Sequence, residues 1–347
     1  ISTNPTGIPA RSTESGAPNP VLHRQMPARE NVSGPISVRE TLALLIDLIQ
    51  PFRPRFAGAV LLGALAALAS VALTSVSAWL IIRASEQPPI LYLMVAIVGV
   101  RFFGIGRAVF RYVQRLWMHD AILGALTDVR VRVWEALAAR GPAVRRMLHG
   151  EETLDLLIGD VDRLRDLAPR VLLPPLVGLV AGIVATVALW FILPEAGLLM
   201  LAGSIVSLGV APGLAVWLDG SSRRDAVLAR SALMRRFAAL VASAADLRVN
   251  GIAGRAREEI AALDGKASAL ERRSAWSLGL GSGIVTLASG ATSLAMLAVG
   301  APAVANGEIS HGLMAVLVLT PLAMVEVYDD VVEAVQQWPA LKTVVGR

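Results

Sequence analysis

The sequence contains no cysteine, few aromatic residues and little charge. Without cysteine, the chain can form no disulfide bond, no thiolate metal site and no cysteine nucleophile. Only 17% of its 347 residues are charged, whereas 55% are hydrophobic. A soluble domain is about one quarter charged and under one half apolar. Much of the apolar surface must therefore contact something other than water.

The sequence also lacks the motifs of an ATP-hydrolysing domain. It has no phosphate loop of the form G-x-x-x-x-G-K-[ST], and no Ser-Gly-Gly-Gln signature. The nearest fragment, Asp264 to Ser268, has no glycine five residues before its Gly-Lys pair. We predict no catalytic residue in this chain, and expect ATP and Mg²⁺ to bind a nucleotide-binding domain that follows it.

Long apolar segments are abundant. A membrane span needs about 20 mostly apolar residues, and backbone groups in lipid must pair within a helix or a closed barrel. No segment alternates like a barrel strand, so we predict an all-α membrane protein with six transmembrane helices. The predicted spans lie near residues 56–82, 90–118, 171–193, 196–218, 274–302 and 311–332.

The segment before the first span divides into two parts. Residues 1–36 are rich in Pro, Ser, Asn and Gly, and we expect a disordered linker or tail. Residues 37–50 are amphipathic and suit an elbow helix along the membrane surface. The chain starts at Ile1 and not at Met. We therefore expect a piece of a longer polypeptide.

Basic residues gather in two long connections, after the second and fourth predicted spans. Three short connections, near residues 83–89, 194–195 and 307–310, are poor in Lys and Arg. By the positive-inside rule, the long connections and both termini are cytoplasmic. The formal net charge of +5 thus reflects membrane topology, and we expect lipid and not nucleic acid as a partner. The long connections also have helical periodicity, so we expect spans two to five to extend as helices beyond the bilayer.

Basic residues also occur inside the second predicted span. Arg107, Arg111, Arg115 and His119 are spaced by four residues and form one helical stripe, and Arg101 lies deeper. An arginine near the middle of a bilayer costs about 2.5–3.5 kcal/mol on insertion scales, so such residues favour a bundle interior or a wet cavity. The alternative is that Arg111 and Arg115 extend to the cytoplasmic headgroups.

Three carboxylates, Glu326, Asp329 and Asp330, lie in the inner half of the sixth span. Intramembrane carboxylates are candidates for functional sites. Glu326 could pair with the basic stripe across a cavity, or it could form a structural ion pair between spans six and two. The predicted cavity residues are Arg101, Arg107, Arg111, Tyr112 and Glu326.

Six spans, short outer loops, long inward extensions and an elbow together resemble the transmembrane domain of a type I ABC exporter. The stretch from Gly150 to Leu164 looks like the first coupling-helix region of that family, and residues 245–254 are similar to the second. The resemblance implies contact with the chain's own motor domain. The residues assigned to that contact are Gly150, Glu151, Asp160, Asp162, Arg248 and Gly251.

Two blocks, Ser77 to Ile81 and Gly99 to Ala121, resemble CydC-type subunits of the CydDC exporters, which are required for cytochrome bd assembly. This sequence has Ala78 and Gln114 where those subunits usually have Gly and Glu. The resemblance implies a heterodimer with a CydD-type half-transporter in the bacterial inner membrane. It also implies a cargo of small thiols, cysteine or glutathione, or of haem.

His119 lies beside the interior of the second predicted span. A lone histidine in such a place is more often a structural residue than a ligand. The resemblance implies haem b binding, with His119 as an axial ligand of the iron and Arg115 beside a propionate. Two other functions remain open: a haem-binding sensor or chaperone that does not transport, and an ABC exporter of another cargo such as lipid or peptide. The arginine stripe argues against an apolar cargo.

Overall fold

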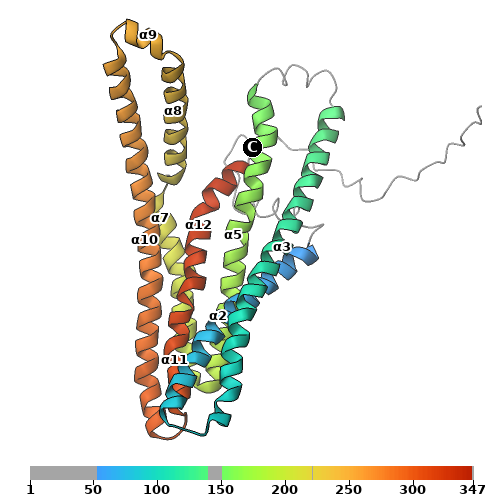
Figure 1. Ribbon diagram of the computed structural model, residues 1–347, viewed down its shortest axis with the longest axis vertical. Coiled ribbons are helices and arrows are strands. Elements are labelled where there is room, and N and C mark those ends of the chain that lie inside the picture. The colour runs from blue at the N-terminus through green and yellow to red at the C-terminus, as the bar shows by residue number, and fades with distance from the viewer. Residues whose placement is uncertain (1–52, 140–150, 221, 346–347) are drawn as a thin grey trace, which may run out of the picture. The chain divides into compact units, whose positions relative to one another are not determined.

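The computed structural model describes residues 53–139, 151–220 and 222–345 (Figure 1), and within these ranges it contains helices and no strand. The predicted linker, the elbow at 37–50 and Gly150 lie outside the described residues. The elements in chain order are α2 (Arg53–Ser85), η2 (Ile90–Tyr92), α3 (Met94–Ala139), α5 (Glu151–Ile192), α6 (Pro194–Ile205), η3 (Val206–Val210), α7 (Ala211–Asp219), α8 (Ser222–Ala242), α9 (Ala244–Val249), α10 (Ala253–Ala305), α11 (His311–Ala323) and α12 (Val325–Val345).

Six helical segments of the described residues are long and apolar enough to cross a membrane. They confirm the predicted all-α membrane fold. The structural segments are longer than the predicted spans and cover Pro54–Ser85, Ile90–Asp128, Arg165–Ile192, Pro194–Asp219, Ala253–Ala305 and His311–Lys342. As the sequence predicts for spans two, three and five, α3, α5 and α10 extend well beyond the apolar windows as continuous helices. The prediction is wrong for span four, which ends with α7 at Asp219 before the separate helix α8 begins at Ser222.

The third and fourth spans form the tight hairpin predicted at Pro194. Only Leu193, in an extended conformation, separates α5 from α6, and Pro194 occupies the first turn of α6. Proline suits this position because its missing N–H needs no partner there. Gly197 allows the close approach, since a Cβ at that position would lie 2.7 Å from the Cα of Trp190.

Two spans are interrupted. The fourth contains the π-helical turn η3 and ends at Gly220, whose φ of 53° favours glycine. The sixth breaks between α11 and α12 at Met324, three residues after Pro321. Pro321 lies inside α11 and lacks the N–H that would pair with the Leu317 carbonyl, which weakens the last turns of that helix. Glu326 consequently lies in the first turn of α12.

The second long connection is a helical hairpin with α9 at its tip (Figure 1). The chain reverses at Gly251, where φ is 68°, and the Asn250 side chain donates to the Asp246 carbonyl at 2.8 Å. Arg236 of α8 donates two hydrogen bonds to Glu259 of α10, at 2.9 and 2.7 Å. This hydrogen bonding raises the pKa of Arg236 above its ordinary value. The bidentate pair holds the two arms together beyond the membrane.

The core of the bundle consists of small and flexible residues. Its buried alanines on α5, α6 and α7 allow close helix approach, and Met200, Met296 and Leu317 fill the space between them. Tyr328 of α12 lies in this core, and its hydroxyl is 2.6 Å from that of Ser204 on α6. Helix α12 packs on α5, α10 and α7, whereas α3 packs mainly on α2.

Candidate functional site

Helix α3 is the least buried of the membrane-crossing segments, with none of its apolar window buried within the chain. Large apolar side chains are exposed along one side at alternating steps of three and four residues: Val95, Val98, Phe102, Ile105, Val109, Tyr112 and Leu116. These positions centre on the side of the helix opposite Arg111. The helix therefore has an apolar side and a separate basic side.

The basic side of α3 faces α12. The Nη2 atom of Arg111 donates to Oε1 of Glu326 at 3.3 Å, across 215 residues of sequence. Both side chains are about half exposed, at 49% and 58%. This contact decides a question that the sequence leaves open, because Arg111 points toward the sixth span. It also brings together two residues of the predicted cavity.

The rest of the basic stripe has no such contact. Arg107 and Arg115 lie one turn before and after Arg111, and His119 lies one turn further. All three are exposed, and none forms an ion pair or hydrogen bond with another described residue. The guanidinium groups of Arg107 and Arg115 and the imidazole of His119 thus have no side-chain partner within the part of the chain that the structure describes.

Helix α12 presents an acidic stripe on the corresponding side. Glu326, Asp330 and Glu333 are exposed, whereas Val327, Val331 and Val332 between them are buried. Asp330 is close enough to Arg111 for their charges to interact. Spans two and six run in the same direction, as alternate spans of a bundle must. From the Arg111–Glu326 contact both helices therefore run on in the same direction, so Arg115 and Asp330, each four residues further along, extend the basic and the acidic stripe on the same side of that contact.

The other predicted cavity residues lie elsewhere on α3. Arg101 is exposed and lies ten residues before Arg111, which turns it by about 80° from the stripe. Tyr112 is 69% exposed and belongs to the apolar side. The structure therefore joins Arg111 to Glu326, with Arg107 on the same side of the helix, but brings neither Arg101 nor Tyr112 to this contact.

His119 and Arg115 are both exposed on neighbouring turns of α3. The next residue, Asp120, pairs with Arg55 of α2 at 3.2 Å, and Met118 is buried against Ala59 and Leu173. These contacts fix the rotation of α3 at this level. An imidazole one turn from a guanidinium, neither of them paired among the described residues, fits the groups that would hold haem: a ring nitrogen for the iron and a cation for a propionate. No cluster of three His, Asp or Glu suited to a metal ion occurs among residues 53–139, 151–220 and 222–345.

The predicted coupling residues occupy two regions. Glu151, Asp160 and Asp162 lie in the first turns of α5. Arg248 lies in α9 and is exposed, and Gly251 forms the reversal that follows it. The α9 tip lies at the same end as the beginning of α5 (Figure 1).

The sequence does not reveal a buried polar cluster where spans four, five and six leave the apolar region. Asp219, Ser277 and Gln336 are 3%, 2% and 1% exposed. The Ser277 hydroxyl donates to Oδ1 of Asp219 at 3.4 Å, and the same hydroxyl oxygen accepts a hydrogen bond from the Gln336 amide at 3.1 Å. The one sequence signal for this cluster is Asp219, an acidic residue that closes a long apolar run.

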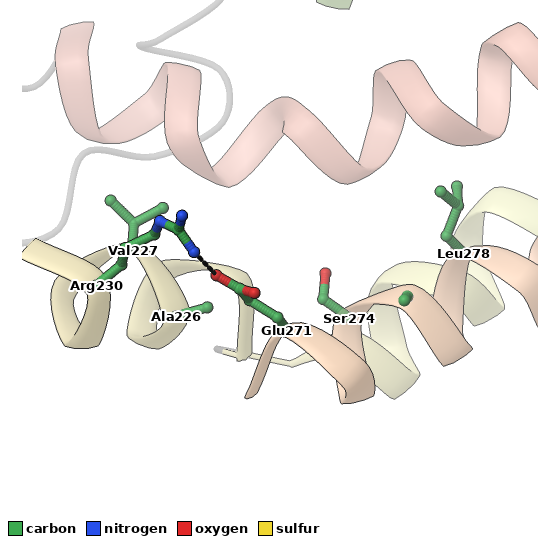
Figure 2. Close-up of a pocket in the computed structure, with 7 residues that line it drawn as sticks. Ala226, Val227, Arg230, Glu271, Ser274 and Leu278 are labelled. Carbon is green, nitrogen blue, oxygen red and sulfur yellow. Dashed lines mark hydrogen bonds and ion pairs between the residues drawn. The ribbon is translucent and has the colours of Figure 1, made fainter. Parts of the chain in front are cut away.

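An open groove of about 340 Å³ lies next to this cluster, between α8 and α10. Figure 2 shows Arg230 of α8 and Glu271 of α10 joined at one end of it, with an N–O distance of 3.0 Å. Its lining residues are Ala226, Val227, Arg230, Glu271, Ser274, Ala275 and Leu278. Arg230 and Glu271 are the charged residues of its lining and pair with each other, whereas the α3–α12 stripes carry further charged groups beside their ion pair. The groove is therefore a weaker candidate for a cargo site.

Six helical spans with long extensions define the class of this protein, an all-α membrane domain of the exporter type. No family model matches the sequence. The chain is nevertheless homologous to the CydC and CydD proteins, at modest identity. With these relatives and the six apolar helices, the chain is a multi-pass membrane protein.

Three curated relatives share the description glutathione/L-cysteine transport system ATP-binding/permease protein. CydC of Escherichia coli is 26% identical over 276 residues, 78% of this chain and 48% of that protein. CydD of Bacillus subtilis is 35% identical over 133 residues, which cover 38% and 23% of the two chains. CydC of Haemophilus influenzae is 38% identical over 76 residues, which cover 22% and 13%. The chain thus spans about half or less of the relatives it matches.

Proposed function

We propose that this chain is the membrane-spanning half of an ATP-driven exporter that moves small thiols, cysteine or glutathione, out of the bacterial cytoplasm. The observation that carries the proposal is the ion pair between Arg111 of α3 and Glu326 of α12, at which the basic and acidic stripes meet. The relatives CydC and CydD are described as parts of a glutathione/L-cysteine transport system, and this description supports the proposal.

The proposal includes the partners that a working transporter needs. A CydD-type half-transporter completes a heterodimer in the inner membrane. Nucleotide-binding domains supply the ATP hydrolysis that drives export. The exporter as a whole is needed for cytochrome bd assembly. Both termini are cytoplasmic in this arrangement, and the α9 tip with Arg248 and Gly251 contacts a motor domain. An apolar cargo such as lipid fits poorly, because charged groups exposed to a low-dielectric cavity need polar partners.

The experiment is reconstitution of the full-length heterodimer in proteoliposomes. We expect cysteine and glutathione to stimulate ATP hydrolysis and to accumulate inside vesicles whose motor domains face outward. Arg111→Gln should lower both signals, whereas Arg235→Gln, which changes an exposed arginine of α8 away from the stripes, should lower neither. If neither thiol stimulates hydrolysis or moves across the membrane, the proposal is wrong.

A second proposal concerns haem, which fits the free donors of His119 and Arg115. When bound, haem supplies a redox-active iron, and the role of this chain is to hold it: His119 offers a ring nitrogen and Arg115 pairs a propionate. We expect His119→Ala to abolish the haem absorbance of the purified heterodimer, and His311→Ala at the outer end of span six to preserve it. Full absorbance in His119→Ala would contradict the assignment. Haem binding without any transport would favour a sensor or chaperone.

A further inference from the structure

The Arg111–Glu326 contact lies where two charged stripes meet. Arg107, Arg111 and Arg115 are exposed along one side of α3, and Glu326, Asp330 and Glu333 are exposed along one side of α12. An anion would meet attraction on α3 and repulsion on α12, and a cation would meet the reverse. The pattern is complementary to a molecule that carries both charges a short distance apart.

The ion pair between Arg111 and Glu326 joins the two stripes and leaves part of each group's hydrogen-bonding capacity unused. Arg111 and Glu326 share a single N–O contact of 3.3 Å, which leaves the second carboxylate oxygen and further guanidinium donors unused. Both groups are about half exposed, so a small solute reaches them without disturbing the core. Exposed single-contact ion pairs contribute little stability, and a cargo can therefore replace this one at small cost.

We propose that Arg111 and Glu326 recognise the α-amino-acid group of the cargo, Arg111 binding the carboxylate and Glu326 binding the ammonium group. This inference rests on the proposed thiol export, because cysteine and glutathione both carry a free α-amino-acid group. The carboxylate matches the two parallel donors of a guanidinium, and the ammonium group donates to the Glu326 carboxylate. Each half of the protein's ion pair then gains a new partner.

The charge balance explains the selectivity. A zwitterion that inserts between Arg111 and Glu326 leaves neither of these charged side chains without a partner. A cargo with a blocked amine separates Glu326 from Arg111 and leaves the Glu326 carboxylate unpaired, and a cargo without a carboxylate leaves Arg111 unpaired. Each analogue therefore forms one charge-assisted contact fewer and leaves one charged side chain without its counter-ion, so both bind less tightly than the zwitterion.

The test uses the full-length heterodimer in nanodiscs and four probes. Cysteine carries both charges, N-acetylcysteine lacks the ammonium group, cysteamine lacks the carboxylate, and serine keeps the α-amino-acid group without the thiol. Affinity is measured from the thermal stabilisation that each probe produces. We expect the wild type to bind cysteine and serine about tenfold more tightly than the two analogues, as loss of one charged hydrogen-bonded contact implies.

The variants assign each charge to its residue. Glu326→Gln should abolish the preference for cysteine over N-acetylcysteine, and Arg111→Gln should abolish the preference for cysteine over cysteamine. Arg235→Gln, the control on α8 away from the two stripes, should keep both preferences. Equal loss of affinity for all probes in both variants would show a merely structural ion pair and overturn the inference.

The failure of this inference differs from that of the proposed function. If cysteine is transported but the wild type binds N-acetylcysteine equally well, thiol export stands and the amino-acid recognition is wrong. If thiols are not transported but serine binds with the expected dependence on Glu326 and Arg111, the recognition stands and the cargo is another amino acid. If no probe stabilises the heterodimer, the recognition is wrong.

Discussion

At the scale of single residues, the environment decides what the sequence leaves open. The four-residue spacing of Arg107, Arg111 and Arg115 fits both a cavity wall and side chains extended to the headgroups. The contact with Glu326 shows that Arg111 turns toward another span. Glycines behave similarly: Gly197 lies against the backbone of Trp190, whereas a Cβ on Gly213 would have no heavy atom within 4 Å.

This difference leads to a paired prediction. Gly197→Ala should lower the free energy of unfolding by about 1–3 kcal/mol, because its Cβ would force α5 and α6 apart at the hairpin. Gly213→Ala should leave stability unchanged or raise it slightly, since alanine favours helix and the space is open. Thermal unfolding of the two purified variants measures both effects. Equal stability would contradict the close approach at Trp190.

At the scale of elements, buried hydrogen bonds join helices across an apolar core. Tyr328 connects α12 to α6 through Ser204, and Gln336 connects α12 to α10 through Ser277. Together they fix the rotation of α12 on both sides of its acidic stripe. This fixed rotation keeps Glu326 and Asp330 exposed while Tyr328 is buried.

Removing one partner of the Tyr328–Ser204 bond should therefore destabilise the bundle. Ser204→Ala should cost about 1–3 kcal/mol, because it leaves the buried tyrosine hydroxyl without a partner. Tyr328→Phe should cost about 1 kcal/mol, since a serine hydroxyl can turn to its own helix. The double variant should cost less than the sum of the two. Denaturation of all three variants measures the coupling, and strict additivity would show that the bond is unimportant.

At the scale of the whole molecule, the arrangement depends on the direction of the six spans. Short connections near residues 86–89, 193 and 307–310 lie at one end of the spans, and the α9 tip lies at the other (Figure 1). The positive-inside rule assigns the α9 end to the cytoplasm.

Because the chain contains no cysteine, its topology can be mapped with single introduced thiols. Asn306 and Asn250 are both exposed, the first in the α10–α11 connection and the second beside α9. We expect Asn306→Cys to react with a membrane-impermeant maleimide in intact cells. Asn250→Cys should react only after permeabilisation, and the unsubstituted protein serves as background. The opposite pattern would reverse the predicted orientation.

The sequence determined the class of fold by itself. Apolar runs of sufficient length can only be helices in lipid, and the asymmetry of basic residues predicts their direction. The hairpin at Pro194 and the reversal at Gly251 were also predictable, because proline and glycine restrict or extend the local backbone. These features depend on local composition, which a single sequence displays in full.

Only the tertiary structure decided which distant side chains meet. The Arg111–Glu326 contact spans 215 residues, and the cluster of Asp219, Ser277 and Gln336 joins three separate spans. Periodicity predicts which residues share a side of one helix, but not how that helix is rotated against its neighbours. That rotation follows from the packing of α12 on α5, α7 and α10, and it alone brings Glu326 to Arg111.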